Sequence, residues 1–392
     1  MVVHPGESSR TPFLRGILVH SLQNAGLKFS DAHAVANAVR DELESTREIG
    51  PDALKLRVIE VLERMGYEEV VPAYRNSRKP LTIEIISRDG ELTDFSRQEY
   101  YDQLKAIGLR ADEGAAVVDH LHRYLLRRGG GPMSANTIAR VIYRMLRSSQ
   151  QFGKAVARRW LVWLDFIQSG RPMVILIGGT AGSGKSTLAA DLASCLAITR
   201  SQSTDILREV IRSTRGNEEQ PLLHQSSFSA WKLLPEATKS QFSERDELIY
   251  EGFRHQADAM SSAIEAVIER AAHEKVSMIM EGVHLRPAHV QQYQKSKDTI
   301  IIPLVLGVVK RKRLQQRLSR RSARVPQRRA ERYLNHLDEI CCLQSALLSE
   351  ADEYGVPIIL NEDKEVTFRE IMLAVNERLS MDCSSSPEEV FG

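Results

Sequence analysis

The sequence predicts an α/β protein whose C-terminal half is a parallel sheet with helices on both faces, preceded by a mainly helical N-terminal half. From Pro172 onward, short apolar runs alternate with helical segments, which is the pattern of a parallel sheet covered on both sides. Before that point, apolar residues recur mostly at helical spacing. The chain has 392 residues, and single cores seldom grow that large, so more than one domain is expected.

The N-terminal half is predicted to contain two helical units after a disordered leader at 1–11. The first unit, 12–80, has apolar residues every three or four positions, with Asp31 as the expected cap of its second helix and Gly50-Pro51 before its third. The second unit, 81–169, opens with a short strand and the turn Arg88-Asp89-Gly90, and a Gly-Pro segment at 128–132 interrupts its helices. Residues 22–27 (LQNAGL) are echoed by 104–109 (LKAIGL), which either a degenerate repeat or a chance similarity between helices explains.

The C-terminal half is predicted to be one domain, 170–381, followed by a disordered tail at 382–392. Its five expected strands are 173–177, 197–199 leading to Thr204, 276–280, 300–309 and 356–360.

Composition restricts the classes of function. The chain holds 53 Lys and Arg against 51 Asp and Glu, a formal net charge of +2, which argues against general binding to nucleic acid or to a membrane surface. Its four cysteines fit neither a disulfide framework nor a zinc spacing. The N-terminus lacks the apolar core of a signal peptide, and no apolar run is long enough for a membrane span. We expect a cytoplasmic protein of undetermined oligomeric state.

The strongest motif is GTAGSGKST, formed by Gly179, Thr180, Ala181, Gly182, Ser183, Gly184, Lys185, Ser186 and Thr187. It fits the phosphate-binding P-loop pattern G-x-x-x-x-G-K-[ST], and it lies between an apolar strand and a helix, as that motif requires. Backbone N–H groups and the helix N-terminus would surround the phosphates of a nucleotide. Lys185 is predicted to reach the β- and γ-phosphates of ATP, and Ser186 to bind Mg²⁺. A chance glycine-rich turn is the structural alternative.

A second oxygen ligand is expected near the metal. Glu281 ends the strand at 276–280, and a carboxylate at the carboxyl end of a parallel strand faces the ligand crevice. Glu281 is therefore predicted to be a catalytic residue and metal ligand, with a strand-end cap as the structural alternative. His284 is predicted to contact substrate or to make a structural hydrogen bond, and both interpretations stay open.

The acceptor side is predicted to start after the second strand. Asp205 either caps the following helix or accepts the proton of an acceptor hydroxyl, beside which it would act as a catalytic residue. Arg208 and Arg212 lie four residues apart on one helix face and could clamp an anionic substrate.

The segment 310–332 is strongly basic and follows a predicted strand. A solvated helix face, a nucleic-acid patch and a lid that closes on phosphates are the three interpretations. Its position directly after a sheet strand favours the lid, with Arg317, Arg320, Arg321 and Arg324 as candidate residues, and the lack of interleaved aromatic residues disfavours the nucleic-acid patch.

These pieces resemble the archaeal 2-phosphoglycerate kinase family and its bacterial and plant relatives over 174–361. The similar stretches are ILIGGTAGSGKST, STDILREVIR, LLHQSSFSAWKLL, EGFRHQADAMSSAIEAVIERA and IMEGVHLRP. The N-terminal half resembles the ATP-cone, a small regulatory nucleotide-binding module, through IEIISRDGELTDFSR at 83–97. The first helical unit lacks the opening strand of that module.

The resemblance implies transfer of the γ-phosphate of ATP, bound with Mg²⁺, to the 3-hydroxyl of 2-phosphoglycerate, giving 2,3-bisphosphoglycerate. Lys185 and Ser186 would hold MgATP, while Asp205 and Arg208 would contact the small anionic acceptor. An inositol phosphate is the alternative acceptor, because plant relatives resemble proteins of inositol phosphate metabolism. A non-catalytic nucleotide-sensing regulator is the alternative class of function, and a nucleic-acid kinase or helicase-like ATPase is disfavoured by the near-neutral charge.

Overall fold

The chain forms two compact units in the computed structural model, which describes residues 2–3, 10–11, 15–43, 49–76, 83–87, 89–127, 132–214, 220–294, 298–324 and 330–392. Unit 1 comprises the described residues of Met1–Tyr101 and Ala111–Lys154, together with Phe391. Unit 2 comprises those of Asp102–Arg110 and Ala155–Val390, together with Gly392.

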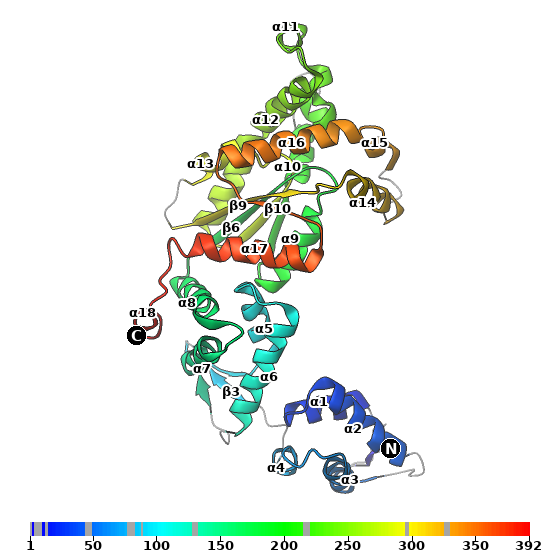
Figure 1. The fold of residues 1–392 in the computed structure, drawn as a ribbon, viewed down its shortest axis with the longest axis vertical. Coiled ribbons are helices and arrows are strands. Elements are labelled where there is room, and N and C mark those ends of the chain that lie inside the picture. Colours follow the sequence, from blue (N-terminus) through cyan, green and yellow to red (C-terminus); the bar gives the residue numbers. More distant parts are fainter. Residues whose placement is uncertain are drawn as a thin grey trace. The chain divides into compact units, whose positions relative to one another are not determined.

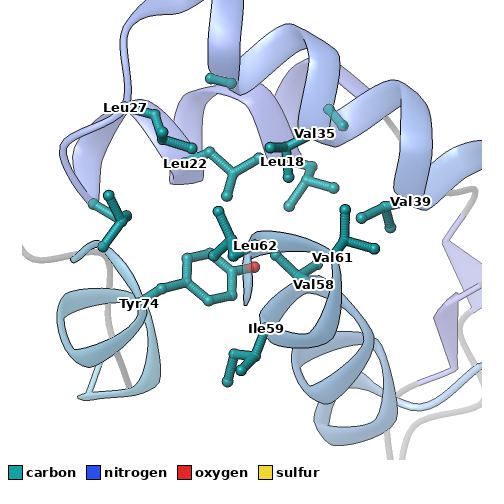
Figure 2. Close-up of a cluster of buried hydrophobic side chains, with 14 of the residues drawn as sticks. Leu18, Leu22, Leu27, Val35, Val39, Val58, Ile59, Val61, Leu62 and Tyr74 are labelled. Carbon is teal, nitrogen blue, oxygen red and sulfur yellow. The ribbon is translucent and has the colours of Figure 1, made fainter. Parts of the chain in front are cut away.

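Unit 1 begins with a helical bundle. Its elements are β1 (Val2–Val3), β2 (Arg10–Thr11), α1 (Arg15–Asn24), α2 (Phe29–Glu42), α3 (Pro51–Arg64) and α4 (Val71–Asn76). Leucine, isoleucine and valine side chains from α1, α2 and α3 meet in one buried cluster, which the ring of Tyr74 from α4 completes (Figure 2). The described part of 12–80 thus forms helices that share one apolar core, as the helical spacing of its apolar residues predicts.

Two details of this bundle differ from the sequence-based expectations. Asp31 is not a cap: Lys28 precedes the first helical residue of α2, and Asp31 lies within the first turn without a side-chain cap bond. An acid in that turn still favours the helix through the dipole. The leader expected to be disordered includes the antiparallel pair β1 and β2, while 4–9 lie outside the described residues.

The second part of unit 1 combines a small sheet with helices. Its elements are β3 (Glu84–Ile86), β4 (Leu92–Asp94), α5 (Arg97–Ala106), α6 (Ala111–Arg127), β5 (Met133–Ser134) and α7 (Ala135–Ser148), and the last residues of α5 belong to unit 2. The strand predicted before the Asp89-Gly90 turn is confirmed, and it pairs with β4 and β5 in the order β4-β3-β5. Neither partner strand was expected, because a strand of two or three residues is too short to show an alternation of apolar and polar residues. Residues 88 and 128–131 lie outside the described residues.

Unit 2 contains the elements that carry the predicted site. Its helices are α8 (Gly153–Ser169), α9 (Lys185–Cys195), α10 (Thr204–Thr214), α11 (Glu236–Lys239), α12 (Arg245–His273), α13 (Val290–Tyr293), α14 (Arg311–Arg324), α15 (Ala330–Leu334), α16 (Leu337–Glu353), α17 (Lys364–Leu379) and α18 (Pro387–Phe391). The first two residues of α8 and the last residue of α18, Phe391, belong to unit 1. Its short 3-10 turns are η1 (Pro221–His224), η2 (Ser227–Leu233) and η3 (Pro287–His289). Its strands are β6 (Met173–Gly178), β7 (Arg200–Ser203), β8 (Met278–Glu281), β9 (Ile300–Gly307) and β10 (Ile358–Leu360).

The five strands form one all-parallel sheet in the order β10-β9-β6-β8-β7. Side chains of β6 and β8 on one face pack against the apolar stripe of α12, which includes Met260, Ile264 and Ile268. Helices α9 and α17 contact the opposite face, and Figure 1 shows them on the other side of the sheet from α12 and α16. The predicted α/β fold class, with helices on both faces of a parallel sheet, is confirmed.

Two segments of unit 2 differ from the prediction. The second strand begins at Arg200 instead of Ala197, because β7 is an edge strand whose exposed face requires no apolar run. The tail expected to be disordered forms α18, capped by Ser386, and places the Phe391 ring against Tyr143 and Arg140 of α7. Burial of that aromatic ring explains why the polar tail is ordered. Within the described residues, no helix has the length and apolarity that crossing a bilayer requires.

Candidate active site

The candidate site lies where three neighbouring parallel strands end. Strand β8 lies between β6 and β7, and its last residue, Glu281, is in register with Ile177 of β6 and with Ser203 of β7. The P-loop follows β6 and helix α10 follows β7, so both start at the same edge of the sheet as Glu281. Open α/β sheets bind ligands at this edge.

The P-loop has the backbone conformation that phosphate binding needs. Gly184 precedes α9 with φ +94°, and a Cβ at this position would meet the side-chain amide of Asn361. Only glycine adopts this left-handed conformation without strain. The loop therefore leads into α9 with the backbone N–H groups of its first turn available to an anion.

Lys185 lies inside the P-loop. Its side chain is 9% exposed, and Nζ donates to the carbonyl oxygen of Thr180 at 2.8 Å and lies 3.5 Å from Oγ of Ser183. The ammonium group of Lys185 thus lies within the P-loop, where its charge would complement that of a phosphate.

Ser186 and Glu281 are joined directly. The Ser186 hydroxyl donates to Oε1 of Glu281 at 2.9 Å, which links the first turn of α9 to the end of β8. Hydroxyl and carboxylate oxygens are the ligands that hard divalent cations prefer. Among the described residues, no group of three or more His, Cys, Asp and Glu side chains could hold a metal ion. The Ser186–Glu281 pair fits a divalent ion that takes its other ligands from water and nucleotide phosphates.

Asp205 lies exposed in the first turn of α10. Its backbone N–H donates to Oγ of Ser203, the residue in register with Glu281. The hydroxyl of Ser203 thus takes the capping role that was one interpretation of Asp205, and no bond of the Asp205 carboxylate to the helix start is among the described contacts. Ser203 is in register with Glu281, so α10, which carries Asp205, starts at the sheet edge where β8 ends.

Arg208 and Arg212 are half-buried on α10. Arg208 donates from Nη1 to the carbonyl oxygen of Gln225 at 2.9 Å, and Arg212 pairs with Glu209 at 2.7 Å. The buried Nε atoms of both arginines have no hydrogen-bond partner among the described residues. Buried polar groups are normally satisfied, so these two donors are consistent with a bound anion.

His284 is fully buried, and both of its ring nitrogens lie within hydrogen-bond distance of a side chain. Nδ1 is 3.0 Å from the hydroxyl of Thr204, and Nε2 is 3.2 Å from Oε1 of Gln256. Burial, followed by the charge of Arg208, lowers the pKa of His284 far below its ordinary value. These contacts favour the structural interpretation of His284 over direct contact with substrate.

Comparison with known proteins identifies the family. No family model matches the chain. The chain is 34% identical over 298 residues to a 2-phosphoglycerate kinase of Pyrococcus furiosus, covering 76% of this chain and 94% of that protein. It is 32% identical to the 2-phosphoglycerate kinase of Pyrococcus horikoshii, covering 74% and 92%, and 28% identical to that of Methanopyrus kandleri, covering 76% and 88%. The chain belongs to the 2-phosphoglycerate kinase family. It is accordingly an ATP-dependent kinase with an alcohol group as acceptor.

The basic helix α14 of this kinase packs beside the P-loop. Leu314 and Leu318 are buried, and a Cβ at Gly182 of the P-loop would meet both. Arg317 donates to the carbonyl oxygens of Ser183 and Asn361 at 3.2 and 2.7 Å. Arg320 is exposed, and the side chains of Arg321 and Arg324 lie outside the described residues. The lid role of these four arginines remains a prediction.

Two further residues of the candidate site were not expected from the sequence. Asn361 follows β10, and its amide donates to the Ser183 carbonyl at 2.8 Å, so it holds the P-loop together with Arg317. Gln256 of α12 contacts His284. A polar residue directly after the last predicted strand was a usable signal for Asn361. Gln256 lies inside a long helix, and its sequence position carries no such signal.

Proposed function

We propose that this kinase transfers the γ-phosphate of ATP, bound with Mg²⁺, to the 3-hydroxyl of 2-phosphoglycerate and forms 2,3-bisphosphoglycerate. The acceptor is the substrate named in the curated relatives. One observation carries the proposal. The groups suited to the nucleotide, the metal and the acceptor follow three adjacent strands, β6, β8 and β7, in register at one sheet edge.

The nucleotide side of the site would bind and orient the triphosphate. The backbone N–H groups of the P-loop would hold the phosphates, and the ammonium group of Lys185 would approach the β- and γ-phosphate oxygens after leaving the Thr180 carbonyl. Fixed positive groups of this kind stabilise charge that develops on the transferred phosphoryl group.

The acceptor side would hold the anionic groups and one hydroxyl of a small acceptor. Arg208 and Arg212 each have a buried Nε donor without a partner among the described residues, which suits the phosphate or carboxylate of 2-phosphoglycerate. The acceptor hydroxyl oxygen would attack the γ-phosphorus while the bond to the β–γ bridging oxygen breaks. The hydroxyl proton would pass to the carboxylate of Asp205, and ADP would leave with the bridging oxygen.

Mg²⁺ would be held by Ser186 and Glu281, whose oxygens already lie 2.9 Å apart. When bound, the ion neutralises part of the phosphate charge. Glu281 would also orient Ser186 in the absence of the ion, so that the hydroxyl is positioned before the nucleotide arrives.

The test is acceptor-dependent release of ADP. Purified protein is incubated with Mg-ATP and, separately, with 2-phosphoglycerate and a panel of inositol phosphates, with Lys185→Ala as the blank. Release of ADP with 2-phosphoglycerate that is absent in the blank would support the proposal. Release only with an inositol phosphate would replace the acceptor. Nucleotide binding without acceptor-dependent release would favour the regulator hypothesis.

A further inference from the structure

His284 connects three parts of the candidate site through buried hydrogen bonds. It lies three residues after Glu281, its ring faces Thr204 at the start of α10, and it faces Gln256 on α12. Exposure of the His284 ring is zero. A buried polar network of this kind strongly constrains the geometry of its members.

The direction of the hydrogen bonds follows from Gln256. Its Nε2 lies 2.6 Å from the carbonyl oxygen of Leu222 and 3.1 Å from that of Gln225. Carbonyl oxygens only accept, so the amide nitrogen must face them and Oε1 must face His284. The ring therefore carries its proton on Nε2 and donates to Gln256. Nδ1 then accepts from the hydroxyl of Thr204.

Each end of this chain of hydrogen bonds leads to a residue that is predicted to contact the acceptor substrate. Thr204 immediately precedes Asp205, and it packs so closely on Gly282 that a Cβ there would overlap its hydroxyl. At the other end, the Gln225 carbonyl accepts from Nη1 of Arg208 as well as from Gln256. Arg208 keeps its buried Nε without a partner among the described residues.

We propose that His284 is a positioning residue for the acceptor. Through Gln256 it fixes the turn at 222–225 whose carbonyl orients Arg208, and through Thr204 it fixes the start of α10 that carries Asp205. Arg208 then holds the anionic group of the acceptor at a fixed distance from Asp205, which receives the proton of the acceptor hydroxyl. This inference rests on the proposed function and adds a residue that acts on the acceptor without touching it.

Two substitutions separate the two links of His284. The amide of His284→Asn reaches the position of Nδ1, so it can keep the bond to Thr204 and loses the bond to Gln256. The amide of His284→Gln reaches the position of Nε2 and can keep the bond to Gln256. His273, which is exposed at the end of α12, supplies a matched His→Asn control.

The expected result is a change in one Michaelis constant. Loss of a buried hydrogen bond in His284→Asn should raise the KM for 2-phosphoglycerate about tenfold while the KM for ATP changes less than about twofold. His284→Gln should stay closer to the wild-type KM for 2-phosphoglycerate, and His273→Asn should leave both constants unchanged.

A purely structural role gives a different result. Lower melting temperatures in both His284 variants, with an unchanged KM for 2-phosphoglycerate, would overturn the inference.

If His284→Asn does not fold, Thr204→Val and Thr204→Ser give a second test. The serine variant keeps the hydroxyl and should retain kcat, whereas the valine variant should lose it, and equal kcat values would overturn the inference. A wild-type protein inactive with 2-phosphoglycerate would overturn the proposed function as well.

Discussion

The hydroxyl of Ser186 donates a 2.9 Å hydrogen bond to Oε1 of Glu281, which joins the first turn of α9 to the end of β8. The two residues are 95 positions apart in the sequence. Their contact places a hydroxyl oxygen of the P-loop helix beside a carboxylate of the neighbouring strand, and oxygens of these two kinds are the ligands that a divalent ion prefers.

Substitution of either residue should impair transfer more than folding. Ser186→Ala and Glu281→Gln should each lower kcat by about 10²–10³-fold. The first removes one oxygen ligand of the metal ion and the second removes the negative charge of another, so the ion would stabilise the charge on the transferred phosphoryl group less well. Both variants should also need more Mg²⁺ for half-maximal rate. Steady-state kinetics over a Mg²⁺ series measures both effects. Wild-type Mg²⁺ dependence in the two variants would show that the metal binds elsewhere.

Removal of the Asp205 carboxylate should impair phosphoryl transfer and leave ATP binding intact. Asp205→Ala should keep ATP binding and lose at least about 10²-fold in kcat, because a positioned general base contributes that much. Equilibrium binding of ATP and acceptor-dependent ADP release are measured on the same preparation. A variant that retains full transfer would show that Asp205 is not the base.

Asn361 should act on the nucleotide side alone. Its amide and Arg317 both donate to the Ser183 carbonyl, so Asn361→Ala should loosen the P-loop and raise the KM for ATP about tenfold. The KM for 2-phosphoglycerate should stay within about twofold of the wild type, the reverse of the pattern expected for His284→Asn. Equal changes in both constants would indicate general damage to the domain.

Acid pH should destabilise unit 1 through His122. The side chain is buried in α6, and burial with the charge of Arg97 lowers its pKa from 6.5 to about 4. The neutral ring is favoured in the folded state, so the unfolded chain binds more protons between these values. Stability is therefore complete above pH 6.5 and falls as the pH drops toward 4, by up to about 3 kcal/mol.

Denaturant unfolding of the wild type and His122→Gln at pH 7.5 and pH 5 tests this pH dependence. The wild type should lose more unfolding free energy on acidification than the variant, which lacks the titrating ring. Equal losses would mean that His122 is protonated in the folded state at its ordinary pKa.

The nucleotide side of the site could be predicted because its signal is local. Strand, P-loop and helix follow one another within 173–195, and each imposes its own pattern on the sequence. The strand-end position of Asn361 was a signal that it lies at the sheet edge, but its hydrogen bond to the P-loop could not be predicted. Asn361 lies 178 residues after Ser183 and reaches it only once β10 joins the sheet. The Thr204–His284–Gln256 contacts similarly depend on packing between β8, α10 and α12.

The echo between 22–27 and 104–109 has a local explanation. Gly26 and Gly108 both have positive φ, and in each case the following leucine donates to the carbonyl of the leucine five residues earlier, which is a common way to end a helix. Tyr67 makes the same bond to Leu62 after Gly66, outside the echoed pair. Helix capping is therefore sufficient to explain the shared Gly-Leu pair, and the duplication stays a prediction.

The most direct test of the proposed function is the identity of the phosphorylated product. The protein is incubated with ATP, Mg²⁺ and 2-phosphoglycerate, and the mixture is followed by ³¹P nuclear magnetic resonance with Lys185→Ala in parallel. The proposed function predicts that ADP appears together with the two phosphate signals of 2,3-bisphosphoglycerate, and that the variant forms neither. ADP accompanied only by inorganic phosphate, with 2-phosphoglycerate unchanged, would contradict it.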